Sequence, residues 1–234
     1  MSIKLSVIIP VAKGDETWRN LLPDLVALDF VDEIIFVSPK SKEADLASEV
    51  ARVGLARSCQ WMTSEEGRAK QFNWGVKNSL NSVLWFLHCD SRVSNAGIRK
   101  LKRMSAMNPK HILFFDLDFL MDGPRMIFIN KIGAWIRSRI LRLPFGDQGF
   151  CMSREVFLSL GGFDEKASYG EDHLLIWKAH QSGVPMKCIG GGLKTSARKY
   201  ANQGWIKTTF WHVTLTIRQA LPELKLWLRD RRPS

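Results

Sequence analysis

The stretch from Val83 to Asp90 reads V-L-W-F-L-H-C-D, an apolar run that ends in polar residues. A short apolar run bounded by polar residues predicts a buried strand, here over 83–89. Side chains two positions apart in a strand point to the same face, so we expect His88 and Asp90 to project together. Because ligands in open α/β sheets bind beyond the carboxyl ends of the strands, this end of the run is a candidate site.

Similar patterns lie on both sides of this stretch. Short apolar runs predict strands over 4–11, 32–38, 58–63 and 111–120, and helical spacing of apolar residues predicts helices over 18–28, 42–56, 68–79 and 95–107. Alternation of strand and helix is typical of a mostly parallel sheet with helices on both faces. The sequence therefore predicts an α/β fold with a Rossmann-like sheet.

The alternation ends after Leu120. The later patterns predict a long amphipathic basic helix over 125–143, a strand over 150–153, a short helix over 154–160, a helix over 171–182 and a strand over 185–189. A last apolar helix is expected over 208–221, because Pro222 should interrupt it.

The chain has 234 residues and a net charge of +11, and its 45% hydrophobic content excludes disorder as the main state. Basic residues gather in two places. Residues 123–144 contain five basic residues and no acidic residue. Residues 194–234 contain nine basic and two acidic residues. We therefore divide the chain into a main domain, 1–193, and a basic amphipathic helical segment, 194–234, packed on it or extending from it.

Such basic stretches predict an anionic partner, which could be nucleic acid, a phospholipid surface or a phosphorylated small molecule. The chain has no known nucleic-acid-binding motif, so we expect no nucleic-acid partner. An amphipathic basic helix that carries Trp is suited to peripheral contact with an anionic membrane. The predicted helix over 125–143 is suited to a homodimer contact.

The compartment is predicted from the cysteines and the N-terminus. The four cysteines are far apart and form no C-x-x-C pair, which argues against a zinc module or a disulfide framework: Cys59, Cys89, Cys151 and Cys188. The apolar run from Leu5 to Ala12 is too short for a signal peptide and contains Pro10. We expect a cytoplasmic location, including the inner face of the membrane.

Three places could carry chemistry. Asp90 could hold a divalent cation or cap its turn, with His88 simply packed nearby. Asp172 opens a predicted helix, where an acid either caps free amides or acts as a general base. His173 is an alternative base. Arg68 at another helix start could bind an anion or lie on a solvated face.

The order of the motifs is more specific than any one of them. They run S-V-I-I-P at 6–10, G-R-A-x-Q-x-N-x-G at 67–75, L-H-x-D at 87–90, G-D-Q-G at 146–149, L-G-G-F-D at 160–164 and G-E-D at 170–172. In this order the chain resembles family 2 glycosyltransferases with the GT-A fold. More narrowly, it is similar to the rSAM/selenodomain-associated transferase branch.

The resemblance implies a metal-dependent inverting glycosyltransferase, which moves a sugar from a nucleotide-sugar donor to the hydroxyl of an unidentified acceptor. Mn²⁺ or Mg²⁺ would be the cofactor, held by Asp90 and His88. Asp172 would be the catalytic base, with Glu171 beside it. The residues implied on the donor side are Pro10, Glu16, Arg68, Asn73, Asp90 and Arg198, and those on the acceptor side are Asp147 and Gln148.

The sequence departs from the family pattern at two positions. Ser38 stands near the place where the family carries an acid after the second strand, and His88 replaces the first Asp of the metal signature. Imidazole can ligate Mn²⁺, so a metal site remains the expectation. The alternative is a catalytically degenerate protein on the transferase fold, which binds a ligand or lies on a membrane.

Overall fold

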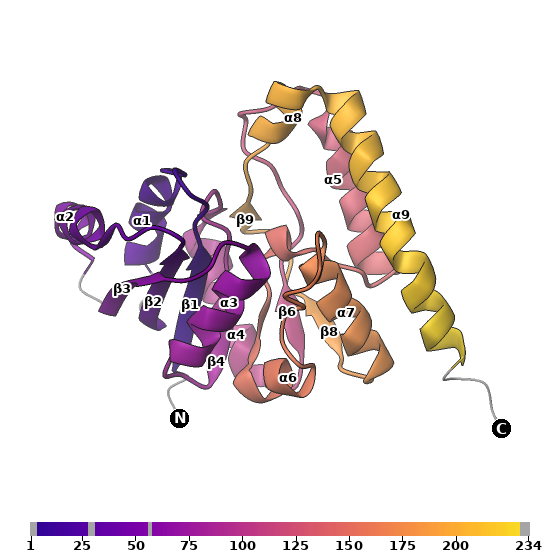
Figure 1. Cartoon of the computed structure of the whole chain (residues 1–234), viewed down its shortest axis with the longest axis horizontal. Helices are drawn as coiled ribbons and strands as arrows, with labels where there is room; N and C mark the ends of the chain where they lie inside the picture. The colour runs from indigo at the N-terminus through magenta and orange to yellow at the C-terminus, as the bar shows by residue number, and fades with distance from the viewer. Residues whose placement is uncertain (1–3, 28–30, 56–57, 230–234) are drawn as a thin grey trace.

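A seven-stranded sheet forms the centre of the computed structural model, which describes residues 4–27, 31–55 and 58–229 (Figure 1). The strand order is β3 (Ser58–Thr63), β2 (Val31–Ser38), β1 (Leu5–Pro10), β4 (Val83–Phe86), β7 (Cys151–Ser153), β6 (Ile112–Phe114) and β8 (Met186–Cys188). Strands β3, β2, β1 and β4 are parallel, β7 is antiparallel to both neighbours, and β8 is parallel to β6. This confirms the predicted mostly parallel α/β sheet.

Helices cover both faces of the sheet, because successive side chains of a strand point to opposite sides. In β1, Val7 and Ile9 belong to one buried cluster and Ile8 to the other. The first cluster includes α1 (Trp18–Val26), α2 (Glu43–Val53) and α4 (Asn95–Met107). The second includes α3 (Arg68–Asn78), α6 (Arg154–Ser159) and α7 (Glu171–Gln181).

The parallel register brings the ends of β1, β2 and β4 to one edge. Ile8 lies opposite Phe86, and the Leu87 amide donates to the Ile8 carbonyl at 3.1 Å. From α3, the Gln71 side chain donates to the carbonyls of Val11 and Val37 at 2.9 and 2.7 Å. The loops that follow these strands are therefore held close together.

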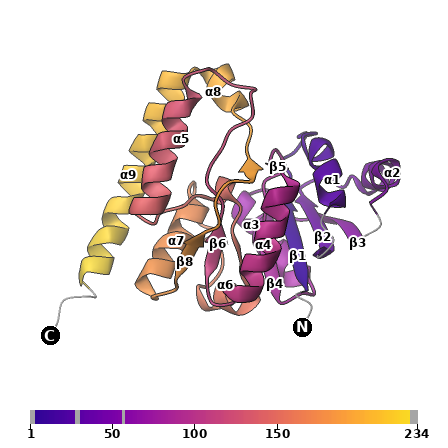
Figure 2. The same cartoon turned by 180° about the vertical axis from the view of Figure 1, so that it is seen from behind.

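The second half of the chain adds an outer helical layer. Its helical elements are α5 (Ile127–Trp135), the π-helical turn η1 (Ile136–Ile140), the 3₁₀ turn η2 (Gly146–Gln148), α8 (Arg198–Gln203) and α9 (Trp205–Arg229). A small second sheet pairs strand β5 (Arg92–Val93) with β9 (Leu193–Lys194). Figures 1 and 2 show α5 and α9 side by side, far from β1–β3. Asn130 joins them, because it accepts from Trp205 Nε1 at 2.6 Å and donates to Thr209 Oγ1 at 3.0 Å.

Two predicted strands are shorter than expected. β4 ends at Phe86 rather than at 89, because the chain turns at His88, whose carbonyl accepts from the Ser91 amide at 3.1 Å. β6 ends at Phe114 rather than at 120, because the next amides bond to loop carbonyls of Gln148 and Gly190.

The predicted end of the last helix at 221 is wrong, because α9 continues through Pro222 to Arg229. Because proline has no N–H, Pro222 cannot donate a hydrogen bond to the carbonyl of Arg218, four residues earlier. Arg218 and Pro222 are both exposed, so water can bond to this carbonyl. The predicted helix over 125–143 is α5 continued by η1. Leu28 and Ala56, the last predicted residues of two helices, and the final residues 230–234 lie outside the described residues.

The predicted division at residue 193 falls within β9, and it remains a prediction. In the described part of the chain, no helix is both long and apolar enough to cross a membrane. The four cysteines are free thiols.

Candidate active site

A cavity of about 520 Å³ lies beyond the end of β1. Its walls are the loop 12–17, Asn20 and Arg198 from α8. Within the loop, Asp15 Oδ1 accepts from the Thr17 amide and hydroxyl at 2.8 and 2.6 Å. Glu16 pairs with Arg19 at 2.9 Å and also with Lys42. The structure thus brings Glu16 and Arg198 together.

Asp90 follows β4 and is half-buried. Its Oδ1 accepts a long hydrogen bond from Thr195 Oγ1 at 3.5 Å. Burial raises the pKa of Asp90, the charge of Arg198 opposes this, and the negative charges of Asp15 and Asp122 add to it. Asp90 therefore lies among the groups of the 12–17 loop and α8, and these residues form what we call the donor half of the site.

Asp172, in the first turn of α7, is fixed by two backbone amides. Gly146 donates to Oδ2 at 2.6 Å, and His173 donates to Oδ1 at 2.9 Å. Burial alone would raise the pKa of Asp172, but the charge of Arg68 and these amides outweigh it and hold the pKa below its usual value. Asp172 is an ionised, rigidly held carboxylate.

Arg68 connects α3 to α7. Its Nε pairs with Glu171, and its Nη2 lies 3.9 Å from Asp172 Oδ1. Burial opposes the charge on the guanidinium, but the two carboxylates outweigh it and raise the pKa of Arg68. One cation thus neutralises two buried acids, so Glu171 is placed to orient Arg68 rather than to meet a substrate directly.

Two buried polar atoms beside Asp172 have no hydrogen-bond partner: His88 Nε2 and Asp147 Oδ1. A Cβ placed on Gly146 would lie 2.9 Å from Asp172 Oδ2 and 3.3 Å from His88 Nε2, so the three residues are packed together. Burial and the charge of Arg68 lower the pKa of His88, which keeps the ring neutral. Burial raises the pKa of Asp147 to about 6, despite the nearby charge of Arg137.

Arg137 is a member of this cluster that the sequence did not single out. Its guanidinium lies 3.3 Å from the centre of the Phe145 ring and donates to the Leu143 carbonyl at 2.5 Å. Burial lowers the pKa of Arg137 to about 10, although Asp147 and Asp172 oppose this. No motif marks it among the basic residues of 125–142. Arg68, His88, Arg137, Asp147, Glu171 and Asp172 form what we call the acceptor half of the site.

His173 is not available as a base, because both ring nitrogens are engaged. Trp177 Nε1 donates to His173 Nε2 at 3.0 Å, so Nδ1 carries the proton and donates to Gln219 Oε1 at 2.9 Å. The amide of Gln219 then donates to the Tyr169 carbonyl at 3.0 Å. His173 instead ties α7 to α9, and Asp172 is the remaining candidate of the two.

Three predicted site residues make contacts within the fold. Asn73 donates to the Phe163 carbonyl at 2.9 Å and accepts from its amide at 3.1 Å. Gln148 is fully buried and donates to the Phe115 carbonyl at 2.7 Å. Pro10 is buried at the end of β1 and does not line the cavity beside it. These three residues therefore support the backbone around the site.

The side chains that could ligate a cation suit one that is also held by a substrate. Among the described residues, no three His, Cys, Asp or Glu side chains form a ligand group by themselves. Mg²⁺ is commonly held by one or two protein carboxylates together with phosphate oxygens and water. Asp90 fits this role. The unpartnered Nε2 of His88 is also a ligand atom that such a cation accepts, but it packs against Gly146 and Asp172 in the acceptor half.

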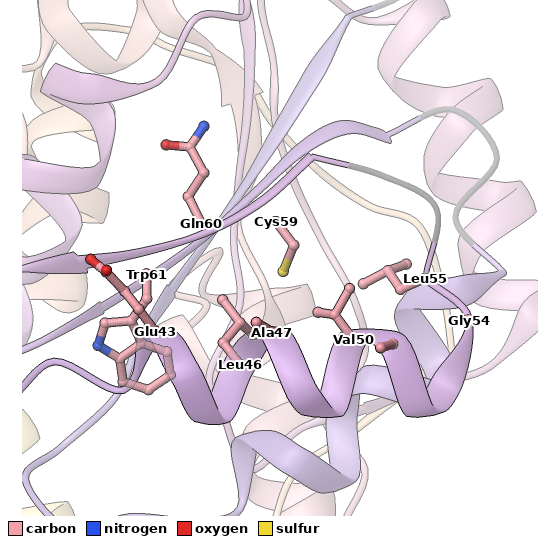
Figure 3. Close-up of a pocket in the computed structure, with 10 residues that line it drawn as sticks. Glu43, Leu46, Ala47, Val50, Gly54, Leu55, Cys59, Gln60 and Trp61 are labelled. Atoms are coloured by element: carbon pink, nitrogen blue, oxygen red, sulfur yellow. The ribbon is translucent and has the colours of Figure 1, made fainter.

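A second cavity, of about 790 Å³, lies between α2 and β3. Cys59 and Trp61 point toward α2 in Figure 3, whereas Gln60 points away. Its lining is mainly apolar, and Glu43 is the one charged residue among those that line it. This cavity lacks the grouped charges of the first, so we place the candidate site at the carboxyl ends of β1 and β4.

No family model and no curated protein matches the sequence. Solved structures do resemble the fold. The mannosyltransferase PcManGT from Pyrobaculum calidifontis, in complex with GDP-Man and Mn²⁺, matches with a TM-score of 0.66 and 16% identity over 97% of this chain and 68% of that one.

Residues 1–349 of S. aureus TarS, in complex with UDP-GlcNAc, match with a TM-score of 0.62 and 17% identity over 83% of this chain and 58% of that one. The match spans 37% of a longer TarS chain. At 16% and 17% sequence identity, this structural similarity establishes the fold alone. The chain therefore has a GT-A-like α/β fold, shared with solved structures that hold nucleotide-sugar donors.

Proposed function

We propose that the protein is a metal-dependent, inverting glycosyltransferase of the family 2 type. One observation carries the proposal: a rigidly held Asp172 packs with His88 around Gly146, and His88 Nε2 and Asp147 Oδ1 in this cluster are buried without a partner. The charged cavity lined by the 12–17 loop and Arg198 provides a separate space for a donor. Buried polar atoms are normally bonded, so the unpartnered ones point to a missing ligand. The nucleotide sugars bound by the two solved structures support this class of donor.

The donor would bind in the donor half. We assign its nucleoside to the cavity beside Glu16 and its diphosphate to the space between Asp90 and Arg198. Mn²⁺ or Mg²⁺, held by Asp90 and His88, would neutralise charge on the diphosphate. Arg198 and the exposed part of Arg68 would add positive charge where the leaving group develops its negative charge.

Transfer would then proceed by direct displacement. The acceptor oxygen forms a bond to the anomeric carbon while the bond from that carbon to the phosphate oxygen breaks. The nucleoside diphosphate leaves with the electron pair, and Asp172 takes the acceptor proton. Asp172 accepts this proton as the attacking oxygen becomes acidic on bonding to the anomeric carbon. Asp147 and Gln148 would lie on the acceptor side, and attack from that side inverts the anomeric centre.

The test is the Asp172→Asn variant. Asparagine keeps the shape and can still accept from the Gly146 amide, but it cannot take a proton. We expect unchanged donor affinity and turnover reduced about 10²–10⁴-fold, measured with a sugar donor and an acceptor mixture by release of nucleoside diphosphate. Near-normal turnover in this variant would contradict the assignment.

A non-catalytic binding protein on the same fold is the second candidate. The observation that favours it is Ser38, which is buried at the end of β2 where the family carries an acid. Such a protein would bind a nucleotide with no turnover at all, even in the wild type, so the same assay separates the two functions.

A further inference from the structure

The outer face of α9 carries a long apolar stripe. Its residues recur at every third or fourth position and are 38–76% exposed: Ile206, Phe210, Val213, Ile217, Leu221, Leu224 and Leu228. This spacing puts them on one side of a helix, over a length of roughly 33 Å. The opposite side, which includes Thr208, His212 and Gln219, packs on the protein. The stripe is therefore apolar surface that the described fold leaves uncovered.

Helix α5 and the turn η1 add to this surface. Phe128, Ile132, Trp135 and Ile140 are 50–62% exposed. Asn130 holds α5 against the start of α9, so both helices lie along the same side of the molecule (Figure 2). The exposed apolar residues of α5 lie on the side of that helix away from Asn130, so they extend the exposed apolar area beyond α9. Exposed apolar area of this extent marks an interaction site. We call it the α5/α9 surface.

A row of basic residues runs along the stripe. Lys207, Arg218, Lys225 and Arg229 each follow a stripe residue directly in sequence, so they lie about a quarter-turn round the helix from it. All four are exposed. Within the described part of α9 the one acid, Glu223, lies on the packed side and accepts from Gln181 at 2.8 Å. Among the described residues of α9, the surface thus combines an apolar stripe with positive charge, and the one acid lies on the opposite side.

We propose that the α5/α9 surface binds an anionic lipid bilayer, with α9 lying in the plane of the interface. Apolar side chains would enter the region below the head groups, and the basic row would meet the acidic head groups. A second copy of the chain fits less well, because antiparallel two-fold pairing of α9 would bring the two basic rows together. The proposal does not depend on the proposed catalytic function.

The test is binding of the full chain to vesicles, followed by flotation. We expect binding to phosphatidylcholine vesicles that contain phosphatidylglycerol, with weaker binding to phosphatidylcholine alone and at high salt. The double variant Phe210→Ser/Ile217→Ser should lose at least about tenfold in affinity, because it removes two inserted side chains. Lys207→Glu/Arg218→Glu should lose the preference for anionic vesicles.

Leu80→Ser is the matched control, since Leu80 is 86% exposed on a loop after α3 and should leave vesicle binding unchanged. Circular dichroism and thermal melting check that each variant folds. Wild-type vesicle binding by Phe210→Ser/Ile217→Ser, or no binding of the wild type to anionic vesicles, would overturn the proposal. A dimer that this double variant dissociates would assign the surface to a second copy.

Discussion

The donor and acceptor halves of the site are built in opposite ways. The donor half is an open cavity, where Asp90 and Arg198 come from loops and a short helix. In the acceptor half, Arg68 pairs with the buried acids Glu171 and Asp172, and His88 Nε2 and Asp147 Oδ1 are left without a partner. The difference indicates that the donor half depends on a ligand for its completion, whereas the fold itself pairs most of the charged groups of the acceptor half.

The largest expected effect separates the two halves directly. Asp90→Ala should weaken metal-dependent donor binding at least about 100-fold, because it removes the main cation ligand. Asp172→Asn should leave donor affinity within about twofold, because the general base acts on the acceptor. Calorimetric titration with nucleoside diphosphate and Mn²⁺ measures both. Equal losses in the two variants would erase the distinction between the halves.

A second comparison concerns stability. Arg68→Met leaves Glu171 and Asp172 without their cation, so the free energy of unfolding should fall by about 2–3 kcal/mol. Arg198→Met changes an exposed arginine in the donor half and should cost less than about 0.5 kcal/mol. Urea unfolding checks both values. A loss as large in Arg198→Met as in Arg68→Met would show that the donor half is also completed by the fold.

Asp147 makes the buried half sensitive to pH. Its pKa is about 6 in the folded protein against an ordinary 3.8, so its stabilising protonated form is lost as the pH rises through about 6. Asp147→Asn should therefore raise stability by about 1–2 kcal/mol near pH 8 and by much less near pH 4. Thermal melts at the two pH values measure this. The same gain at both would show that the ionised form carries no penalty.

The smallest effect concerns the link between the acceptor half and α9. Gln219→Ala removes the bonds to His173 and Tyr169 and should cost about 1 kcal/mol. Gln181→Ala, which loses an exposed bond to Glu223, is the matched control and should change stability by less than about 0.5 kcal/mol. Urea unfolding compares them. Equal effects would mean that His173 does not depend on Gln219.

The sequence predicted the first half of the fold well, because local patterns decide it. The helix over 95–107 and the strand over 58–63 have the predicted bounds, since each is a strongly patterned segment between turns. Pro222 misled the prediction, because the exposed face of α9 tolerates it. The early end of β4 depends on a turn at His88 that no apolar pattern records.

The sequence could name residues of the candidate site but could not give their arrangement. The motifs named Arg68, Asp90 and Asp172, yet the pairing of Arg68 with Asp172 joins residues far apart in sequence. The same holds for Arg137, whose role depends on burial beside Asp147. His173 also looked like a base until the bonds from Trp177 and to Gln219 accounted for both nitrogens. Such contacts are set by tertiary packing.

The most direct test of the central claim is thermal unfolding with a panel of nucleoside diphosphates, each with and without Mn²⁺, for the wild type and Asp90→Ala. We predict that one nucleotide stabilises the wild type by about 2.7 kcal/mol at 100 times its Kd, that this needs Mn²⁺, and that Asp90→Ala abolishes it. No stabilisation by any nucleotide, or a shift that neither Mn²⁺ removal nor Asp90→Ala changes, would contradict a metal-dependent donor site.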